Sequence, residues 1–334
     1  MTDAETTRET TVGELSEGQI LRGILDRLPP STAPVGPGDD AAVLVVPDGR
    51  VVATTDTLVH GPDFRLAWSS PFDLGFKSAA VNLADVAAMG ARPIALLVAL
   101  AMPESTPVSF VRGFADGLAA ACAELAPGCA VEGGDLTVSD TLTIAVTALG
   151  SLDGREPVRR SGARAGDGVY VIGELGLAAR GLEVLFGRFT DAQGAPLPVT
   201  DDTRAALSAV DALALSRQLA PRPPLAEALR AADAGATAMM DVSDGLALDA
   251  TRLADASGVT VAFDSATLGE NPALALAGGE DHGFLVTFAP DAEPLGHRVG
   301  TVVPRGADAV TVDGRAWTGR AGWDPYRDWD AGRG

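Results

Sequence analysis

The stretch SPFDLGFKSAAVNLADVAAMGARPIALLVALA (residues 70–101) predicts a helix that is followed directly by a buried strand. Ser70 suits the N-cap, Pro71 the first helical position, and Gly90 the end of the helix. The apolar residues recur at helical spacing and predict one buried face, formed by Phe76, Ala80, Leu83 and Ala87. A separate polar stripe contains Ser78, Asn82 and Asp85. The strand is expected over Ile94–Ala101, so this stretch indicates a helix packed on a sheet.

The remainder of the chain alternates strands and helices in the same way, which indicates an α/β or α+β protein of two domains. We expect a disordered tail over residues 1–12, an N-terminal domain over 13–153 and a C-terminal domain over 154–330. The boundary lies where the sequence turns polar and glycine-rich. Residues 187–199 are expected to form a flexible insertion. The remaining expectations that matter below are strands over 42–46 and 129–132, a helix from 107 that Thr106 caps, and a helix over 202–219.

The composition narrows the classes of partner. The 334 residues include 25 Lys and Arg against 45 Asp and Glu, for a formal net charge of -20. This argues against a nucleic-acid or anionic-membrane partner, because both require a positive surface. Cys122 and Cys129 do not form a C-x-x-C motif, which disfavours zinc and fits a reduced cytoplasm. The N-terminus does not resemble a signal peptide, and no apolar stretch is long enough to span a bilayer.

Aspartates recur beside small residues near the expected ends of strands and helices. Turn and cap chemistry would explain any one of them alone, but the whole set indicates a site. Two carboxylates about 4 Å apart repel by about 1 kcal/mol in water and by about 4 kcal/mol at an effective dielectric of 20. Converging acids therefore require cations, and Mg²⁺ is the usual companion of phosphates. The acids are Asp39, Asp40, Asp56, Asp85, Asp135, Asp241 and Asp244, and the hydroxyls that suit the same ion belong to Thr54, Thr55 and Ser243.

The common nucleotide-binding motifs are absent from the sequence. Lys77 is the only lysine, and it lies in GFKS without the glycine framework of a P-loop. The protein-kinase motif set and a G-x-G-x-x-G turn are also missing. We therefore expect any phosphates to be held chiefly by metal ions and by glycine-rich backbone.

In their order along the chain, the motifs resemble those of the thiamine-monophosphate kinase family, over residues 13 to 326. They are GDDAAVL (38–44), TTDTLV-GPDF (54–64, with His60 at the gap), KSAAVNLADVAAMGARP (77–93), EGGD (132–135), RSGARAGD (160–167), DVSDGL (241–246), GGED (278–281) and GWDPY (322–326). The wider superfamily includes aminoimidazole-ribonucleotide synthetase and selenophosphate synthetase. The resemblance implies a two-domain architecture like that of aminoimidazole-ribonucleotide synthetase, with an N-terminal mixed sheet covered by helices and a C-terminal α/β domain. It also implies a homodimer built from the N-terminal sheets.

The resemblance implies a role for each matching position. The implied ligands of several Mg²⁺ ions are Asp40, Thr54, Thr55, Asp56, Asp85, Asp135, Asp241 and Asp244. The implied ATP contacts are Gly134, Asp135, Arg160 and Ser243. The implied substrate contacts are Asp63, Glu280 and Trp323, whose aromatic face suits a cationic thiazolium ring. Two positions depart from the family pattern: residue 63 is Asp where many relatives have His, and GGED is followed by His282, which we interpret as structural.

The activity implied is an ATP-dependent phosphorylation of thiamine monophosphate to thiamine diphosphate, within thiamine diphosphate biosynthesis in the cytoplasm. We expect direct in-line transfer of the γ-phosphoryl group. The acceptor oxygen is already anionic, so no general base is expected, and Asp56 and Asp135 act as a metal scaffold. The alternatives are a related ATP-using synthetase of the superfamily, a metal-dependent phosphatase and a non-catalytic nucleotide-binding protein. Selenophosphate synthetase fits less well, because residues 1–60 contain no Cys and no Lys.

Overall fold

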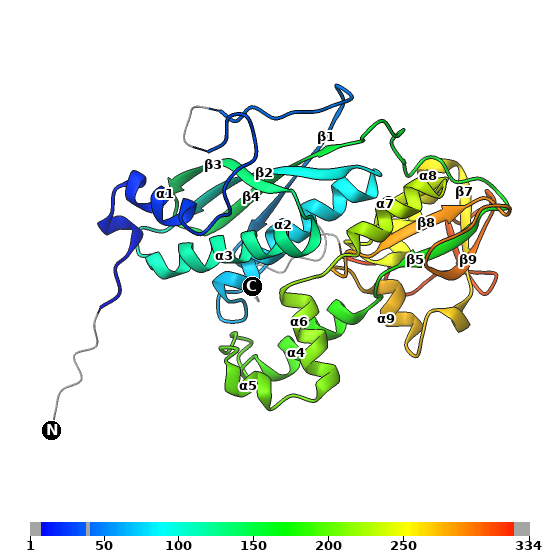
Figure 1. Cartoon of the computed structure of the whole chain (residues 1–334). Helices are drawn as coiled ribbons and strands as arrows, with labels where there is room; N and C mark the ends of the chain where they lie inside the picture. The colour runs from blue at the N-terminus through cyan, green and yellow to red at the C-terminus, as the bar shows by residue number, and fades with distance from the viewer. Residues whose placement is uncertain (1–7, 38–40, 324–334) are drawn as a thin grey trace.

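The computed structural model describes residues 8–37 and 41–323, which form two sheets with helices packed against them (Figure 1). The N-terminal sheet has the strand order β1-β4-β2-β3. Its strands are β1 (Val51–Val59), β2 (Arg92–Met102), β3 (Ala130–Val138) and β4 (Thr143–Ser151). The pair β2 and β3 is parallel, whereas β4 is antiparallel to both of its neighbours. The sheet is therefore mixed, as the resemblance implied.

Helices α2 (Pro71–Ala88) and α3 (Val108–Leu125) lie side by side on one face of this sheet (Figure 1). Helix α1 (Glu17–Leu25) packs beside α3. The cap of α2 is the predicted one, because the Ser70 hydroxyl accepts a hydrogen bond from the Asp73 amide at 3.1 Å. Almost the whole of α2 is buried, including the polar side chains of Lys77, Ser78 and Asn82. This central helix therefore presents polar groups to the interior, where the site described below lies.

The C-terminal sheet has the order β11-β10-β7-β9-β5-β8-β6. Its strands are β5 (Gly168–Ile172), β6 (Ala238–Asp241), β7 (Val259–Phe263), β8 (Phe284–Phe288), β9 (His297–Pro304), β10 (Val310–Val312) and β11 (Arg315–Ala316). The accompanying helices are α4 (Leu177–Arg188), α5 (Asp201–Ala205), α6 (Ala209–Leu219), α7 (Leu225–Asp233), α8 (Leu246–Ser257) and α9 (Pro272–Ala277). Two short 3₁₀ helices cover Val12–Glu14 and Ser265–Thr267.

Four predictions of secondary structure were wrong in part. Residues 42–46 do not form a strand, because Val43 makes only one isolated bridge, to Val35. Strand β3 runs to Val138, so the EGGD motif lies within a strand. Pro107 rather than Thr106 occupies the N-cap of α3. The helix expected over 202–219 is split into α5 and α6, because the Ser208 hydroxyl caps a new helix by accepting from the Asp211 amide.

Two described segments that were expected to be disordered or flexible make backbone hydrogen bonds to the fold. Residues 1–7 of the expected disordered tail, and Asp39 and Asp40, lie outside the described residues. The following segment is attached to the fold, because the Thr10 carbonyl accepts from the Val108 amide at 3.0 Å. Within residues 187–199, the Leu197 amide donates to the Phe189 carbonyl at 2.7 Å, and Val199 bonds to Ala67. The expected insertion is a hydrogen-bonded turn.

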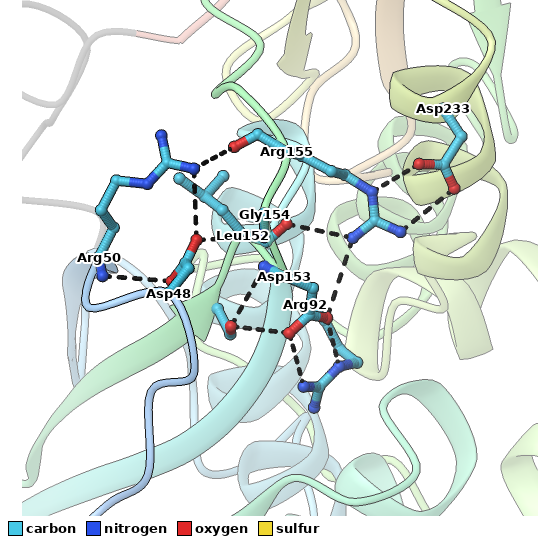
Figure 2. A network of polar contacts seen from close by, with 9 residues as sticks. Asp48, Arg50, Arg92, Leu152, Asp153, Gly154, Arg155 and Asp233 are labelled. Carbon is cyan, nitrogen blue, oxygen red and sulfur yellow. Dashed lines mark hydrogen bonds and ion pairs between the residues drawn. The ribbon is translucent and has the colours of Figure 1, made fainter.

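A network of polar contacts fastens the segment that joins the two sheets (Figure 2). Arg92 makes two hydrogen bonds to Asp153, at 2.8 and 3.0 Å, and Arg155 makes two to Asp233 of α7. Arg50 donates to the Arg155 carbonyl at 2.7 Å. These contacts lie at the predicted domain boundary, which itself stays a prediction. They tie β2 and α7 to the connecting segment, and so set how the two halves approach each other.

The two halves also share apolar packing. One hydrophobic cluster continues from α2 and the N-terminal sheet to residues of the C-terminal half, among them Val158, Met239 and Phe284. Helix α2 contacts α6, α7 and β6. Because buried side chains pack densely, this shared core fixes the position of the C-terminal loops beside α2. None of the helices in the described parts of the chain is long and apolar enough to cross a membrane.

Candidate active site

The site begins with two loops of the C-terminal half that run side by side. One is the segment 241–245, between β6 and α8, and the other is the segment 278–283, between α9 and β8. The Glu280 amide donates to the Ser243 carbonyl at 2.7 Å, and the His282 amide donates to the Val242 carbonyl at 3.1 Å. A Cβ on Gly279 would lie only 2.3 Å from the Ser243 carbonyl oxygen. The pairing of the loops therefore requires glycine at position 279, where the two backbones meet.

Three consecutive side chains of the second loop have three different partners. Glu280 accepts from Lys77 of α2, Asp281 accepts from two backbone amides at the start of α4, and His282 bonds to Asp241. Glu280 and His282 have positive φ angles of 66° and 51°, which L-residues seldom adopt. Because the sign of φ alternates along the loop, neighbouring side chains point toward different elements. One short loop thereby reaches α2, α4 and β6 together.

The N-terminal half contributes two acids from β1 and α2. The Thr54 hydroxyl donates to Asp85 at 2.8 Å, and the Asp56 amide donates to the Asn82 side-chain oxygen at 3.1 Å. Burial, followed by the charges of Asp241 and Asp56, raises the pKa of Asp85 to about 7. Burial also raises the pKa of Asp56. The charges of Asp241 and Asp244 raise it as well, whereas the charge of His282 lowers it. Acids from both halves thus act on one another across the junction.

Asp241 is the buried centre of this group. It ends β6, and its carboxylate lies 3.2 Å from the Nδ1 atom of His282. Burial lowers the pKa of His282, but the hydrogen bond and the negative charge of Asp241 outweigh burial and raise it overall. A neighbouring carboxylate favours the imidazolium form in this way. His282, which the sequence led us to interpret as structural, thus contacts a predicted metal ligand.

Asp244 is held from three directions at the start of α8. Its backbone amide donates to Asp249 at 3.0 Å, and its carboxylate accepts from Arg252 at 2.6 Å. Its carbonyl accepts from the Trp323 amide at 2.8 Å, which brings the late tryptophan to the same loop. Asp249 is fully buried, and burial followed by the charges of Asp241 and Asp244 raises its pKa to about 7. Asp249 and Arg252 were not predicted as site residues.

The structure also places Asp63 and Ser243 beside these groups. Asp63 accepts from the Val59 amide at 2.7 Å just after β1. Burial raises the pKa of Asp63, and the charge of Glu280 raises it as well, so the two predicted substrate contacts lie within electrostatic reach of each other. Ser243 lies half-buried in the first loop, with its carbonyl bonded to Glu280. Asp56, Asp63, Asp85, Ser243 and Glu280 therefore line one junction.

Other predicted site residues lie elsewhere in the monomer. Thr54 and Asp56 face α2, whereas Thr55 points to the opposite face of the sheet, where its hydroxyl donates to the Val146 carbonyl. Asp135 lies exposed on that same opposite face, because it pairs with Ala99 in a row with Thr57.

Gly134 lies against β2, where a Cβ would meet the Val98 carbonyl oxygen at 2.0 Å. The carbonyl of Arg160 accepts from Ser257 at the C-terminal end of α8. A helix of that length spans about 18 Å, so the Arg160 backbone is far from the loop that starts α8. The monomer therefore does not bring Gly134, Asp135 and Arg160 to the junction.

The donor chemistry of the junction suits a hard divalent cation. Within the described residues, no three histidine, cysteine or acidic side chains are grouped so that they could hold a metal ion alone. Mg²⁺ is usually bound by one or two carboxylates together with waters and substrate phosphates. The carboxylates of Asp56 and Asp85 are donors of that kind, and their pKa values are raised by burial and by neighbouring negative charge that a cation would offset. The residues present therefore fit Mg²⁺ that is shared with a phosphate ligand.

Comparisons with known proteins assign this chain to a family. The model of the AIR synthase related protein N-terminal domain matches residues 38–152, and that of the C-terminal domain matches residues 164–313. The chain is 38% identical to the thiamine-monophosphate kinase of Mycobacterium tuberculosis over 97% of this chain and 96% of that protein. The chain belongs to the thiamine-monophosphate kinase family. The family predicted from the ordered motifs is confirmed.

Solved structures of thiamine-monophosphate kinases have the same fold. The kinase from Stenotrophomonas maltophilia K279a is 31% identical, with a TM-score of 0.70 over 93% of this chain and 99% of that one. AaThiL complexed with AMPPCP and TMP is 30% identical, with a TM-score of 0.71 over 94% of this chain and 98% of that one. The two-domain α/β architecture predicted for this chain is thereby confirmed.

Proposed function

We propose that this chain phosphorylates thiamine monophosphate to thiamine diphosphate with ATP, by direct in-line transfer supported by several Mg²⁺ ions. The observation that carries the proposal is the meeting of carboxylates from both halves at one junction. Asp85 of α2 is electrostatically coupled to Asp56 of β1 and to Asp241 of β6. The reaction is inferred from the family, because a structure of the related AaThiL is a complex with AMPPCP and TMP. The acidic junction is where the two phosphate-bearing substrates would meet.

In this proposal, Asp56, Asp85, Asp241 and Asp244 hold Mg²⁺ on the side of α2 and the loop 241–245. The bound ions would screen the repulsion between the two polyanions and stabilise the charge that develops during transfer. Thr54 keeps Asp85 oriented through its 2.8 Å hydrogen bond. Arg252 and Asp249 orient Asp244.

The acceptor needs little activation, because a phosphate oxygen is already anionic at neutral pH. The chain's task is then to position the two phosphates, and positioning alone can lower a barrier by about 7–11 kcal/mol. Glu280, Asp63 and Trp323 are the proposed contacts to the cationic thiamine moiety. Asp241 raises the pKa of His282 and so favours its imidazolium form beside the place where the phosphates would meet.

The decisive experiment incubates purified protein with ATP, Mg²⁺ and thiamine monophosphate and separates the products by chromatography. We expect equal amounts of thiamine diphosphate and ADP, no product with a chelator, and no reaction with thiamine as the acceptor. ADP without thiamine diphosphate would instead indicate a related synthetase. Release of inorganic phosphate from thiamine monophosphate without ATP would indicate a phosphatase. ATP binding without turnover would indicate a binding protein.

The in-line step and the number of ions need separate measurements. ATP made chiral at its γ-phosphorus with oxygen isotopes should give thiamine diphosphate of inverted configuration, since a single in-line displacement inverts phosphorus. Retention would mean a phosphorylated enzyme intermediate. Turnover measured against free Mg²⁺ at saturating MgATP should continue to rise if ions beyond the one bound to ATP are needed. A curve that is flat from the formation of MgATP onward would argue for one ion.

We also propose a cytoplasmic homodimer that forms through the face of the N-terminal sheet opposite α2 and α3. Val51 and Leu97 are exposed on that face, together with Thr55 and Asp135. Two predicted ligands would then lie at the subunit interface. Light scattering on the eluate of a sizing column tests the assembly: Leu97→Glu should convert a dimer into monomers, and a wild-type monomer would contradict the proposal.

The use of ATP and the two free cysteines support a cytoplasmic location.

A further inference from the structure

Lys77 occupies an unusual position for a charged side chain. It lies in the middle of α2, and only 4% of its surface is exposed. Lysine is seldom fully buried unless it is paired. Its Nζ donates to Glu280 at 3.1 Å and to the Gln218 carbonyl at 3.2 Å. The ammonium therefore joins three elements: α2, the C-terminal end of α6 and the loop 278–283.

The second partner explains why a cation is stable there. Gln218 belongs to the last turn of α6, where backbone carbonyls lack helical partners and carry partial negative charge. The side-chain amide of Gln218 also donates to the other carboxylate oxygen of Glu280. Each oxygen of Glu280 is thereby held by a different residue, and the carboxylate can rotate little.

The Glu280 side chain is nevertheless only partly buried. The side chain of Glu280 is 37% exposed, whereas that of Lys77 is 6% exposed. Burial alone would raise the pKa of Glu280, but the charge of Lys77 and the hydrogen bonds from Gln218 and Lys77 outweigh burial and lower it. The electrostatic effect of Glu280 on Asp63 shows that a second carboxylate lies nearby. Two acids, Glu280 and Asp63, thus lie near one buried ammonium at this edge of the site.

We propose that Lys77 and Gln218 are positioning residues that fix the Glu280 carboxylate, so that Glu280 and Asp63 together receive the cationic ring of the acceptor. This inference rests on the proposed function, since the cation is that of thiamine monophosphate. Lys77 contacts Glu280 from the buried side and does not itself touch the substrate. Because the main chain of Glu280 has a left-handed φ, the backbone cannot readily adjust to recover a lost side-chain orientation.

The test measures KM for each substrate separately. Lys77→Met keeps the unbranched stem and removes the ammonium. A charge-assisted hydrogen bond is strong enough that its loss should raise the KM for thiamine monophosphate by about tenfold or more. The KM for ATP should stay within about twofold, because Lys77 contacts none of the proposed ATP ligands. Lys77→Arg keeps the charge and should recover part of the loss. Equal increases in both KM values would indicate a structural role and overturn the inference.

A double-mutant cycle shows whether Lys77 acts through Glu280. Adding Lys77→Met to Glu280→Gln should raise the KM for thiamine monophosphate little beyond that of Glu280→Gln alone. Multiplicative effects would overturn the inference. Gln218→Met, which removes one bond from a different helix, should show the same selective increase and serves if Lys77→Met does not fold. Wild-type protein that forms no thiamine diphosphate would refute the proposed function, whereas an active wild type with unaltered variants would refute only the role of Lys77.

Discussion

Gly279→Ala is expected to inactivate the protein without unfolding it. Gly279 does not have a left-handed φ, so alanine can adopt its backbone conformation, and the obstacle is space alone. The new Cβ would lie 2.3 Å from the Ser243 carbonyl oxygen and 2.9 Å from the carbonyl carbon of Asp244. Close carbon–oxygen contacts are about 3.3 Å or longer, so the two loops must separate by about 1 Å.

This separation acts on the contact that aligns the loops. The Glu280 amide bonds to the same Ser243 carbonyl oxygen at 2.7 Å, so the bond must lengthen or break. Forcing a methyl group into a packed site costs about 1–3 kcal/mol of stability. A misplacement of about 1 Å at a site that works by positioning can lower the rate by about 10²-fold. We therefore expect a large loss of kcat/KM with a modest loss of stability.

The assay combines turnover with urea unfolding. Gly187→Ala is the matched control, because position 187 lies in α4 and a Cβ there would meet nothing within 4 Å. It should keep full activity and gain less than about 1 kcal/mol of stability, because alanine is favoured over glycine in a helix and position 187 lies in the last turn of α4. Full activity in Gly279→Ala would show that the loops tolerate the separation and would refute this reasoning.

Three further predictions concern charge. Asp56→Asn should lower kcat by about 10²-fold or more while leaving the unfolding transition unchanged, because it removes a carboxylate that acts on the charge developing during transfer. An active variant measured at saturating Mg²⁺ would exclude Asp56 from the site. Arg155→Ala should lower the free energy of urea unfolding by about 1 kcal/mol or less, because its pair with Asp233 is largely exposed; a larger loss would show that the junction network is a main source of stability. Burial raises the pKa of Asp281 to about 6, which is above its value in the unfolded chain. The folded protein therefore binds this proton more tightly, and its free energy of unfolding should fall as pH rises from about 4 to 6. This group contributes up to about 3 kcal/mol to that fall. Asp281→Asn should remove this group's share of the slope in urea unfolding, whereas the shares of Asp85 and Asp249 remain, and an unchanged slope would contradict the assignment.

Local signals predicted the helices well. Ser70, Pro71 and Asp73 specify the start of α2 by contacts within four residues, and the structure confirms this start. The strand expected over 42–46 failed because a strand needs a neighbour, and residue 43 makes only a single bridge. The break before α6 was missed although Ser208 and Asp211 form a recognisable cap.

The site was only partly predictable for a related reason. The recurrence of aspartates beside small residues indicated a shared site for Asp56, Asp85, Asp241 and Asp244, and the structure brings these four residues near one another. The contact between Lys77 and Gln218 joins residues 141 positions apart and depends on how α6 approaches α2. Strand pairing placed Asp135 on the opposite face from Asp56. Motif order does not contain that information, because successive residues of a strand alternate between faces.

The burial of the sole lysine has a practical consequence for chemical labelling. Lys77 is the only side-chain amine in the sequence, and it is 4% exposed. An activated ester should therefore modify this side chain slowly while the protein is folded. Modification of Lys77 would require the two halves to separate. The labelled fraction of the peptide that contains Lys77, measured by mass, would therefore report how often the halves open. Slower labelling with both substrates bound would show that the substrates hold the halves together.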